Sequence, residues 1–231
     1  MTQGEIGFAL QNSMQMTFRK HGINRPVVTV VTQVVVDKND PAFQRPTKPI
    51  GPFYSKETAE RKRKELGWSI IEDAARGYRR VVASPLPKDI VELEVIKGCL
   101  ERDIIVVAVG GGGIPVTFDD GELKGIEAVI DKDRASALLA AKLGIEHFII
   151  STEVPEVYIN YKRPNQQKLC SITMVEAKKH FADGQFSEGS MKPKIEAAMD
   201  FLNNGGKMVT ITDPEHLIAA LDGEAGTRIT K

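Results

Sequence analysis

A strand that ends in four glycines is predicted by residues 104–115, whose sequence is IIVVAVGGGGIP. The apolar run from Ile104 to Val109 is short, continuous and mainly β-branched, as in a strand buried on both faces of a parallel sheet. Glycines after such a strand let backbone N–H groups approach an anionic ligand, because no Cβ intervenes. Open α/β sheets bind ligands at this end of their strands. We therefore expect an anion site at Gly110, Gly111, Gly112 and Gly113, with a simple tight turn as the alternative.

Strand-like and helix-like segments alternate on both sides of this stretch. Further strands are predicted at Val27–Val36, His147–Ile150 and Met208–Ile211. Helices are predicted at Asp89–Arg102, Lys132–Leu143 and around Ile195–Leu202, where apolar residues recur with helical spacing. Strands that alternate with helices of this length imply an α/β fold with a mostly parallel sheet covered on both faces.

Local capping and stop signals predict where three helices begin or end. Thr173 and Glu176 have the spacing of a capping box, and Asp213-Pro214 predicts an N-cap followed by proline at the first helical position. Asn204-Gly205-Gly206 predicts a helix stop.

Residues 37–80 interrupt the alternation. This segment is polar, rich in proline and charged residues, and contains one predicted helix near Ser55–Leu66. We interpret it as a surface subdomain or lid inserted into a single domain that comprises residues 1–231. A solvated excursion without function is the alternative.

Charge and composition exclude several classes of protein. The 31 Lys and Arg residues balance 31 Asp and Glu residues, which argues against a general nucleic-acid or membrane-surface binder. The two cysteines are far apart, at positions 99 and 170, which favours a reducing compartment. No secretory signal begins at Met1, and no apolar run approaches the roughly 18 residues of a membrane span. We expect a cytoplasmic protein.

Lysines stand at the ends of predicted elements. Asp131-Lys132-Asp133 opens one helix and Lys192-Pro193-Lys194 opens another, and a helix N-terminus favours anions. Lys48 lies in a segment stiffened by prolines. These lysines could surround a polyphosphate, whereas capping and ordinary solvated charge are the alternatives. The glycine run fits neither GxGxxG nor a P-loop. The four histidines have no ligand spacing, so we expect no metal held by the protein alone.

Four motifs occur in the order typical of one family. They are Thr47–Pro52, Gly110–Pro115, Ala128–Asp133 and Gly189–Lys194. In these motifs, and in the stretches between them, the whole chain resembles the carbamate kinases. The resemblance implies the amino-acid-kinase fold, a three-layer α/β sandwich with a mostly parallel central sheet, a protruding lid and a homodimer. It also implies conversion of ATP and carbamate to and from ADP and carbamoyl phosphate with Mg²⁺, running toward ATP in arginine breakdown.

The resemblance also implies roles for individual residues. Lys132 and Lys194 would contact the transferring phosphoryl group and the nucleotide phosphates, and Asp133 would orient them. Lys48 would close over the acceptor beside Gly110–Gly113. Further nucleotide contacts are expected from Ser151, Thr152, Val154 and Met191.

The chain departs from the family pattern in two places. Pro155 stands where the family usually has aspartate, and neither the Gly-Gly-Asn loop nor the His-Gly-Asn-Gly-Pro loop that opens the family sequence is present. Those loops supply backbone donors to the transferring group, and such donors stabilise a transition state by several kcal/mol each. We therefore expect weak or no activity from this chain alone. The alternative function is a remnant that binds nucleotide or pairs with another subunit.

Overall fold

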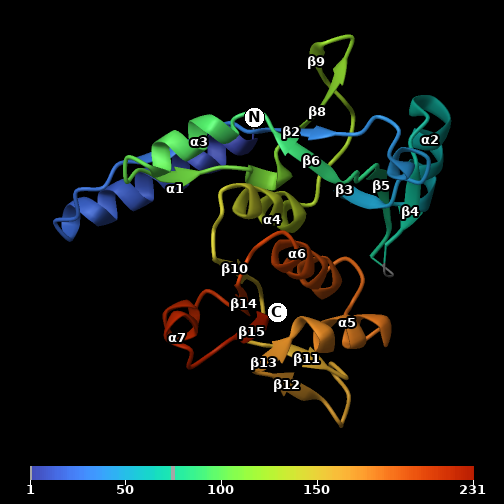
Figure 1. Cartoon of the computed structure of the whole chain (residues 1–231). Helices are drawn as coiled ribbons and strands as arrows, with labels where there is room; N and C mark the ends of the chain where they lie inside the picture. The colour runs from blue at the N-terminus through green and yellow to red at the C-terminus, as the bar shows by residue number, and fades with distance from the viewer. Residues whose placement is uncertain (1, 74–75) are drawn as a thin grey trace. The chain divides into compact units, whose positions relative to one another are not determined.

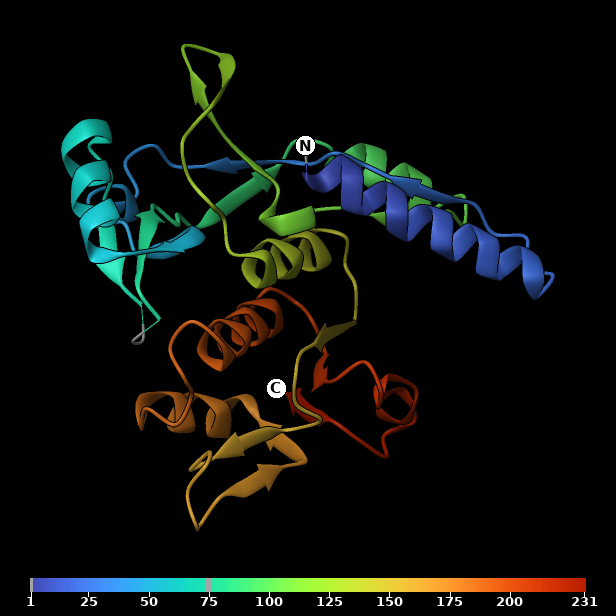
Figure 2. The same ribbon diagram turned by 180° about the vertical axis from the view of Figure 1, so that it is seen from behind.

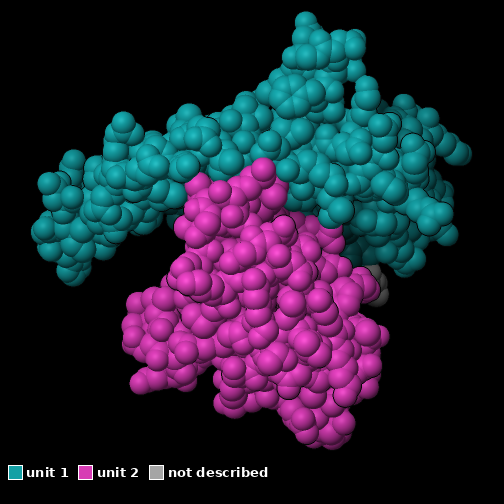
Figure 3. All heavy atoms as spheres, viewed as in Figure 1, with its two compact units in different colours: residues 1–132 teal, residues 133–231 magenta. Residues whose placement is uncertain are grey.

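The structure of the chain is a computed structural model that describes residues 2–73 and 76–231 (Figures 1 and 2). Met1 and two residues of the predicted lid, 74 and 75, lie outside the described residues. The chain divides into two compact units, residues 1–132 and residues 133–231, which Figure 3 distinguishes by colour. The single domain and the lid inferred from the sequence stay predictions.

In the first unit, a long helix covers the edge of a short parallel sheet. Helix α1 (Thr2–Lys20) lies beside β1 (Val27–Thr29), which pairs in parallel with β7 (Ile105–Val107). The side-chain amide of Gln3 donates to Thr32 O and accepts from Thr32 N, at 3.1 and 3.0 Å, and Gln11 accepts from Thr29 N at 2.8 Å. The helix thus satisfies backbone groups that an edge strand would leave unpaired.

A second sheet of this unit has the strand order β6-β2-β8-β9. Its strands are β2 (Gln33–Val36), β6 (Pro87–Ile90), β8 (Ile114–Asp119) and β9 (Glu122–Gly125). The predicted strand Val27–Val36 is therefore two strands in two sheets, because the backbone of Thr32 bonds to Gln3 instead of to β7. The predicted helix at Asp89 was wrong at its start, since residues 87–90 pair with β2 and helix α3 spans Leu93–Leu100.

Residues 37–80 contain more structure than predicted. Helix α2 (Lys56–Leu66) is confirmed, with Ser55 as its N-cap and Gly67 in a left-handed C-cap. A turn of 3₁₀ helix, η1, spans Pro41–Phe43. The antiparallel sheet formed by β3 (Lys48–Tyr54), β5 (Tyr78–Val82) and β4 (Ile70–Glu72) was not predicted. Two prolines and a glycine in β3 conceal it, and the β3–β5 register is irregular between Ile50 and Tyr54.

The second unit has a sheet of order β10-β14-β15-β13 packed against a helix that buries one face in the core. The sheet comprises β10 (His147–Ser151), β13 (Ser171–Thr173), β14 (Met208–Thr212) and β15 (Thr227–Thr230). The other elements are α4 (Lys132–Lys142), a hairpin of β11 (Val157–Ile159) and β12 (Gln167–Leu169), α5 (Met174–Ala182), α6 (Met191–Asn203) and α7 (Leu217–Asp222). Ile195, Phe201 and Leu202 of α6 are completely buried in the core.

The α/β prediction is confirmed, with parallel pairs in both units (β1–β7, β2–β8, β10–β14 and β13–β15). The capping box at Thr173 and the helix stop after Asn203 are also confirmed. The predicted start at Asp213-Pro214 was wrong. Asp213 does accept from the His216 N–H three residues on, at 2.9 Å, as an N-cap would, but helix α7 begins only at Leu217. Within residues 2–73 and 76–231, no helix combines the length and apolarity needed to cross a bilayer.

Candidate functional site

The glycine loop of the first unit is a strained, closely packed turn. Val109 has φ +48°, and Gly111, Gly112 and Gly113 also have positive φ. A β-branched residue rarely adopts this conformation, and here the Val109 N–H is held by Thr32 Oγ1 at 2.9 Å. A Cβ on Gly112 would lie 2.2 Å from Ile130 O. The loop is therefore packed directly against the residue that precedes Asp131.

Lys48 and Asp131 form an ion pair in the same unit. The Lys48 Nζ lies 2.7 Å from Asp131 Oδ2, and the Asp131 side chain is only 10 % exposed. Lys48 is the first residue of β3, so the segment that was predicted to be a lid supplies its lysine to the carboxylate beside the glycine loop.

A second buried ion pair joins two helix starts in the second unit. The Lys194 Nζ lies 3.1 Å from Asp133 Oδ2, with side chains 10 % and 9 % exposed. The first turn of α6 contains Lys192 and Lys194 and no acidic residue, although the positive end of a helix dipole disfavours cations by roughly 0.3–1 kcal/mol. A buried pair contributes little to stability. Because both residues lie at helix N-termini, where anions are favoured, the Lys194 ammonium is placed to bind an anion.

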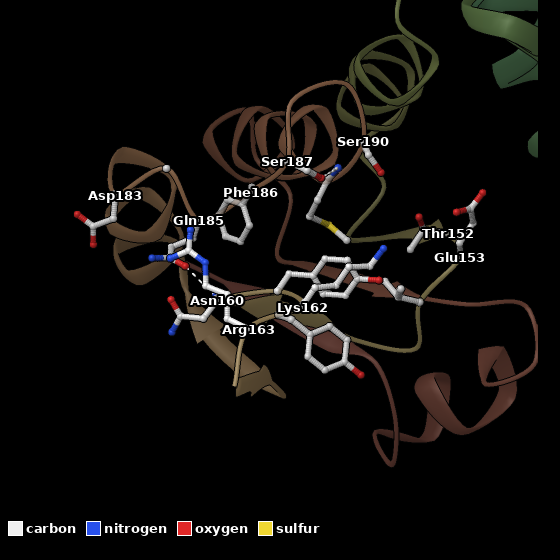
Figure 4. A pocket seen from close by; sticks show the side chains of 15 residues that line it. Thr152, Glu153, Asn160, Lys162, Arg163, Asp183, Gln185, Phe186, Ser187 and Ser190 are labelled. Atoms are coloured by element: carbon white, nitrogen blue, oxygen red, sulfur yellow. Dashed lines mark hydrogen bonds between the residues drawn. The ribbon is translucent and has the colours of Figure 1, made fainter. Parts of the chain in front are cut away.

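A cavity of about 450 Å³ lies elsewhere in this unit, within the range of small-molecule sites (Figure 4). Its lining includes Thr152, Val154, Tyr158, Tyr161, Phe186 and Met191. Two tyrosines with ring centroids 5.9 Å apart, together with Phe186, supply flat apolar surface. Ser187, Ser190 and Asn160 add polar groups. Such a lining suits a planar heterocycle that carries hydrogen-bonding substituents.

The hairpin between β11 and β12 is locked by specific contacts. The Tyr158 hydroxyl donates to Glu156 at 2.9 Å, and burial, with the Glu156 carboxylate, raises the pKa of Tyr158 to about 12. This phenol is therefore neutral at physiological pH. Asn160 N donates to the Gln185 side chain at 2.9 Å, which ties the hairpin to the loop after α5. The cavity wall is thereby pre-formed.

Lys162, which lines this cavity, is held in an unfavourable backbone conformation, φ +60°. Because a left-handed conformation costs a residue with a Cβ roughly 1–2 kcal/mol, Lys162→Gly is expected to raise the free energy of unfolding by about 1 kcal/mol. Urea denaturation of the variant measures this gain. Arg163→Gly is the matched control, since Arg163 is not among the residues with positive φ. A lower stability for Lys162→Gly would contradict the prediction.

The structure distributes the residues predicted from the sequence over three places. Lys48 and Gly110–Gly113 lie in the first unit, Asp133 and Lys194 form the buried pair, and Thr152, Val154 and Met191 line the cavity. Lys132 is the exposed first residue of α4, and Ser151 ends β10 with an exposed side chain outside the cavity lining.

Several residues of these sites were missed by the sequence analysis. Asp131 was quoted as part of a motif but not assigned as the partner of Lys48, which is 83 residues away in the sequence. The cavity residues Tyr158, Tyr161 and Lys162 were also missed. The mixture of aromatic and basic residues in the turn after β11 is the signal that could have identified them. A glycine loop and lysines held by carboxylates on an α/β fold are features suited to phosphoryl transfer.

Comparisons with known proteins agree with this class. The sequence pattern of the amino acid kinase family matches residues 15–213. The carbamate kinase of Thermococcus kodakarensis is 48 % identical over 231 residues, which are 100 % of this chain and 73 % of that protein. Carbamate kinase 2 of Enterococcus faecalis is 47 % identical and covers 100 % of this chain and 74 % of its own length.

A solved structure is similar over the same extent. The carbamate kinase from Giardia lamblia bound to AMP-PNP superimposes with a TM-score of 0.92 at 42 % identity, covering 100 % of this chain and 73 % of its own. The chain therefore belongs to the amino acid kinase family and, within it, to the carbamate kinases. The predicted amino-acid-kinase fold is confirmed, and the chain is a kinase, which is a phosphotransferase.

Proposed function

We propose that this chain transfers a phosphoryl group between ATP and carbamate, in either direction, with ADP and carbamoyl phosphate as the other pair of reactants. One observation carries the proposal. Lys48 and Lys194 are each paired with a carboxylate, Asp131 and Asp133, and these two residues flank Lys132 in the sequence. The motif Asp131-Lys132-Asp133 thus binds Lys48 and Lys194 through its two carboxylates and contributes Lys132 as a third lysine.

Phosphoryl transfer requires charge neutralisation and positioning more than covalent chemistry. In this proposal, Lys132 and Lys194 neutralise the transferring group and the nucleotide phosphates, and Asp133 holds Lys194 in place. Lys48 acts on the acceptor beside Gly110–Gly113, where a Cβ on Gly111 would meet no described atom within 4 Å, so a ligand can approach the backbone there.

The nucleotide is proposed to place its base in the cavity of the second unit. Thr152, Val154 and Met191 line this cavity beside the two tyrosines, and its volume fits a small heterocycle. Binding of AMP-PNP by the similar Giardia lamblia enzyme supports this choice of ligand. Ser151, at the end of β10, is proposed as a further contact.

Magnesium is proposed to enter with the nucleotide. Among the described residues, no group of three or more His, Cys, Asp and Glu side chains is placed to hold a metal ion. Mg²⁺ is commonly bound through substrate phosphates with only one or two carboxylates. The ion therefore belongs to the substrate in this proposal.

We further propose that the chain forms a cytoplasmic homodimer.

ATP formation from ADP, carbamoyl phosphate and Mg²⁺ by the purified chain tests the proposal. The Lys132→Ala variant is expected to be about 10²–10³-fold slower, as for loss of one donor to a transition state. Lys178→Ala, at an exposed position of α5, is the control and should retain the activity. A folded chain without turnover that still binds ADP would instead favour a nucleotide-binding remnant. Equal activity in Lys132→Ala would contradict the role of that lysine.

A further inference from the structure

A second ion pair runs beside the pair of Asp133 and Lys194. Arg134 Nη2 lies 2.6 Å from Glu196 Oε2, with both side chains about one-quarter exposed, at 27 % and 25 %. Arg134 follows Asp133 in the first turn of α4, and Glu196 comes two residues after Lys194 in α6. The same two helices are therefore joined by two ion pairs, one at the start of α6 and one in its second turn.

The two contacts differ in their direction around each helix axis. Successive helical residues are about 100° apart, so Asp133 and Arg134 project in different directions from α4, as do Lys194 and Glu196 from α6. A single ion pair would still allow α6 to rotate about that contact relative to α4. Two ion pairs at different angles around the helix axes oppose such a rotation.

A small rotation would matter at Lys194. A side-chain head lies about 6 Å from its helix axis, so a rotation of roughly 10° moves it by about 1 Å. A misplacement of about 1 Å can cost about 10²-fold in rate where a reacting group must be positioned. A rotation of α6 that the Arg134–Glu196 pair prevents would therefore displace the Lys194 ammonium far enough to lower the rate of transfer.

Arg134 also interacts electrostatically with a second carboxylate of α6, Asp200. Asp200 lies one turn beyond Glu196, and burial raises the pKa of its carboxyl, an effect that the charge of Arg134 opposes and that of Glu196 reinforces. Arg134 is thus within electrostatic reach of both carboxylates of this helix face.

We propose that Arg134 is a positioning residue, which fixes the rotation of α6 through Glu196 and thereby holds the Lys194 ammonium where it meets the nucleotide phosphates. This inference rests on the function proposed above for Lys194. Arg134 itself does not touch the reacting group.

The test compares Arg134→Met, Arg134→Lys and the charge-swapped double variant Arg134→Glu/Glu196→Arg. For each, kcat and KM for ATP formation, ADP affinity by calorimetry and the midpoint of thermal unfolding are measured. We expect Arg134→Met to lower kcat at least about tenfold. Arg134→Lys should recover part of the loss, and the swapped pair should return to within about threefold of the original. The swapped pair Glu146→Lys/Lys207→Glu, in which both side chains are about two-thirds exposed, is the control and should leave kcat unchanged.

Lys194→Ala in the same series separates the two proposals. If Lys194→Ala loses activity and ADP affinity while folded Arg134→Met retains both, the positioning role is overturned and the proposed function stands. A charge-swapped variant that folds but stays as inactive as Arg134→Met also overturns it. If neither Lys194→Ala nor Arg134→Met changes activity or ADP affinity, the proposed role of Lys194 fails, and the positioning role of Arg134 fails with it, while the measured turnover still supports the proposed function. If the original chain shows no turnover, the ADP affinities of Lys194→Ala and of the Arg134 variants are compared with that of the original chain, and the same outcomes apply.

Discussion

Replacing Lys194 with alanine is expected to slow ATP formation about 10³-fold, because the variant loses a buried cation proposed to contact the transferring group. The same change leaves Asp133 as a buried carboxylate without this lysine, and removing one partner of a buried pair costs about 3–5 kcal/mol of stability. Steady-state kinetics and urea denaturation measure the two effects separately.

Two further variants separate catalysis from folding. Lys194→Arg keeps the charge and should keep most of the stability, whereas Asp133→Asn/Lys194→Met removes both charges and should recover stability without recovering turnover. Near-normal kcat in the doubly neutral variant would exclude a role for this pair in phosphoryl transfer.

Replacing Gly112 with alanine is expected to destabilise the first unit by about 3 kcal/mol or more. The new Cβ would lie 2.2 Å from Ile130 O, a backbone atom that cannot move aside cheaply, and φ is already +97°. Urea denaturation measures the loss of stability. ATP formation should fall with it, because Ile130 leads directly into Asp131.

Gly111 is the matched control for this experiment. It has φ +64°, but a Cβ there would meet no atom of the described residues within 4 Å, so Gly111→Ala should cost only about 1–2 kcal/mol of backbone strain. Equal losses for the two variants would mean that backbone conformation alone, and not contact with Ile130, makes glycine necessary at position 112.

The helices with local end signals were predicted well. Ser55 caps α2 by accepting from Thr58 N, and Thr173 and Glu176 form a reciprocal box at α5. These interactions join residues three apart in the sequence, so their spacing is visible without a structure. Asp213 makes the same kind of contact, accepting from the His216 N–H three residues on, yet helix α7 begins only at Leu217, so this local signal marks a turn and not a helix start.

The strands were predicted less well, because their partners are distant in the sequence. The run Val27–Val36 has uniform β propensity, yet it divides where Thr32 pairs with Gln3. Residues 48–54 read as a stiff polar loop, yet they pair with residues 78–82. Strand formation depends on what lies alongside, and local composition does not contain that information.

The sequence by itself determined the family, the helices with local caps and the residue types of the site, namely a glycine run and lysines at element ends. Only the tertiary structure decided which charges meet. Lys48 is 83 residues from Asp131, and Lys194 is 61 residues from Asp133. The same holds for the cavity, whose wall joins the β11–β12 hairpin to the loop after α5 through Asn160 and Gln185. An ion pair or a cavity is a relation between side chains that folding brings together, whereas periodicity and capping record only the nearest neighbours along the chain.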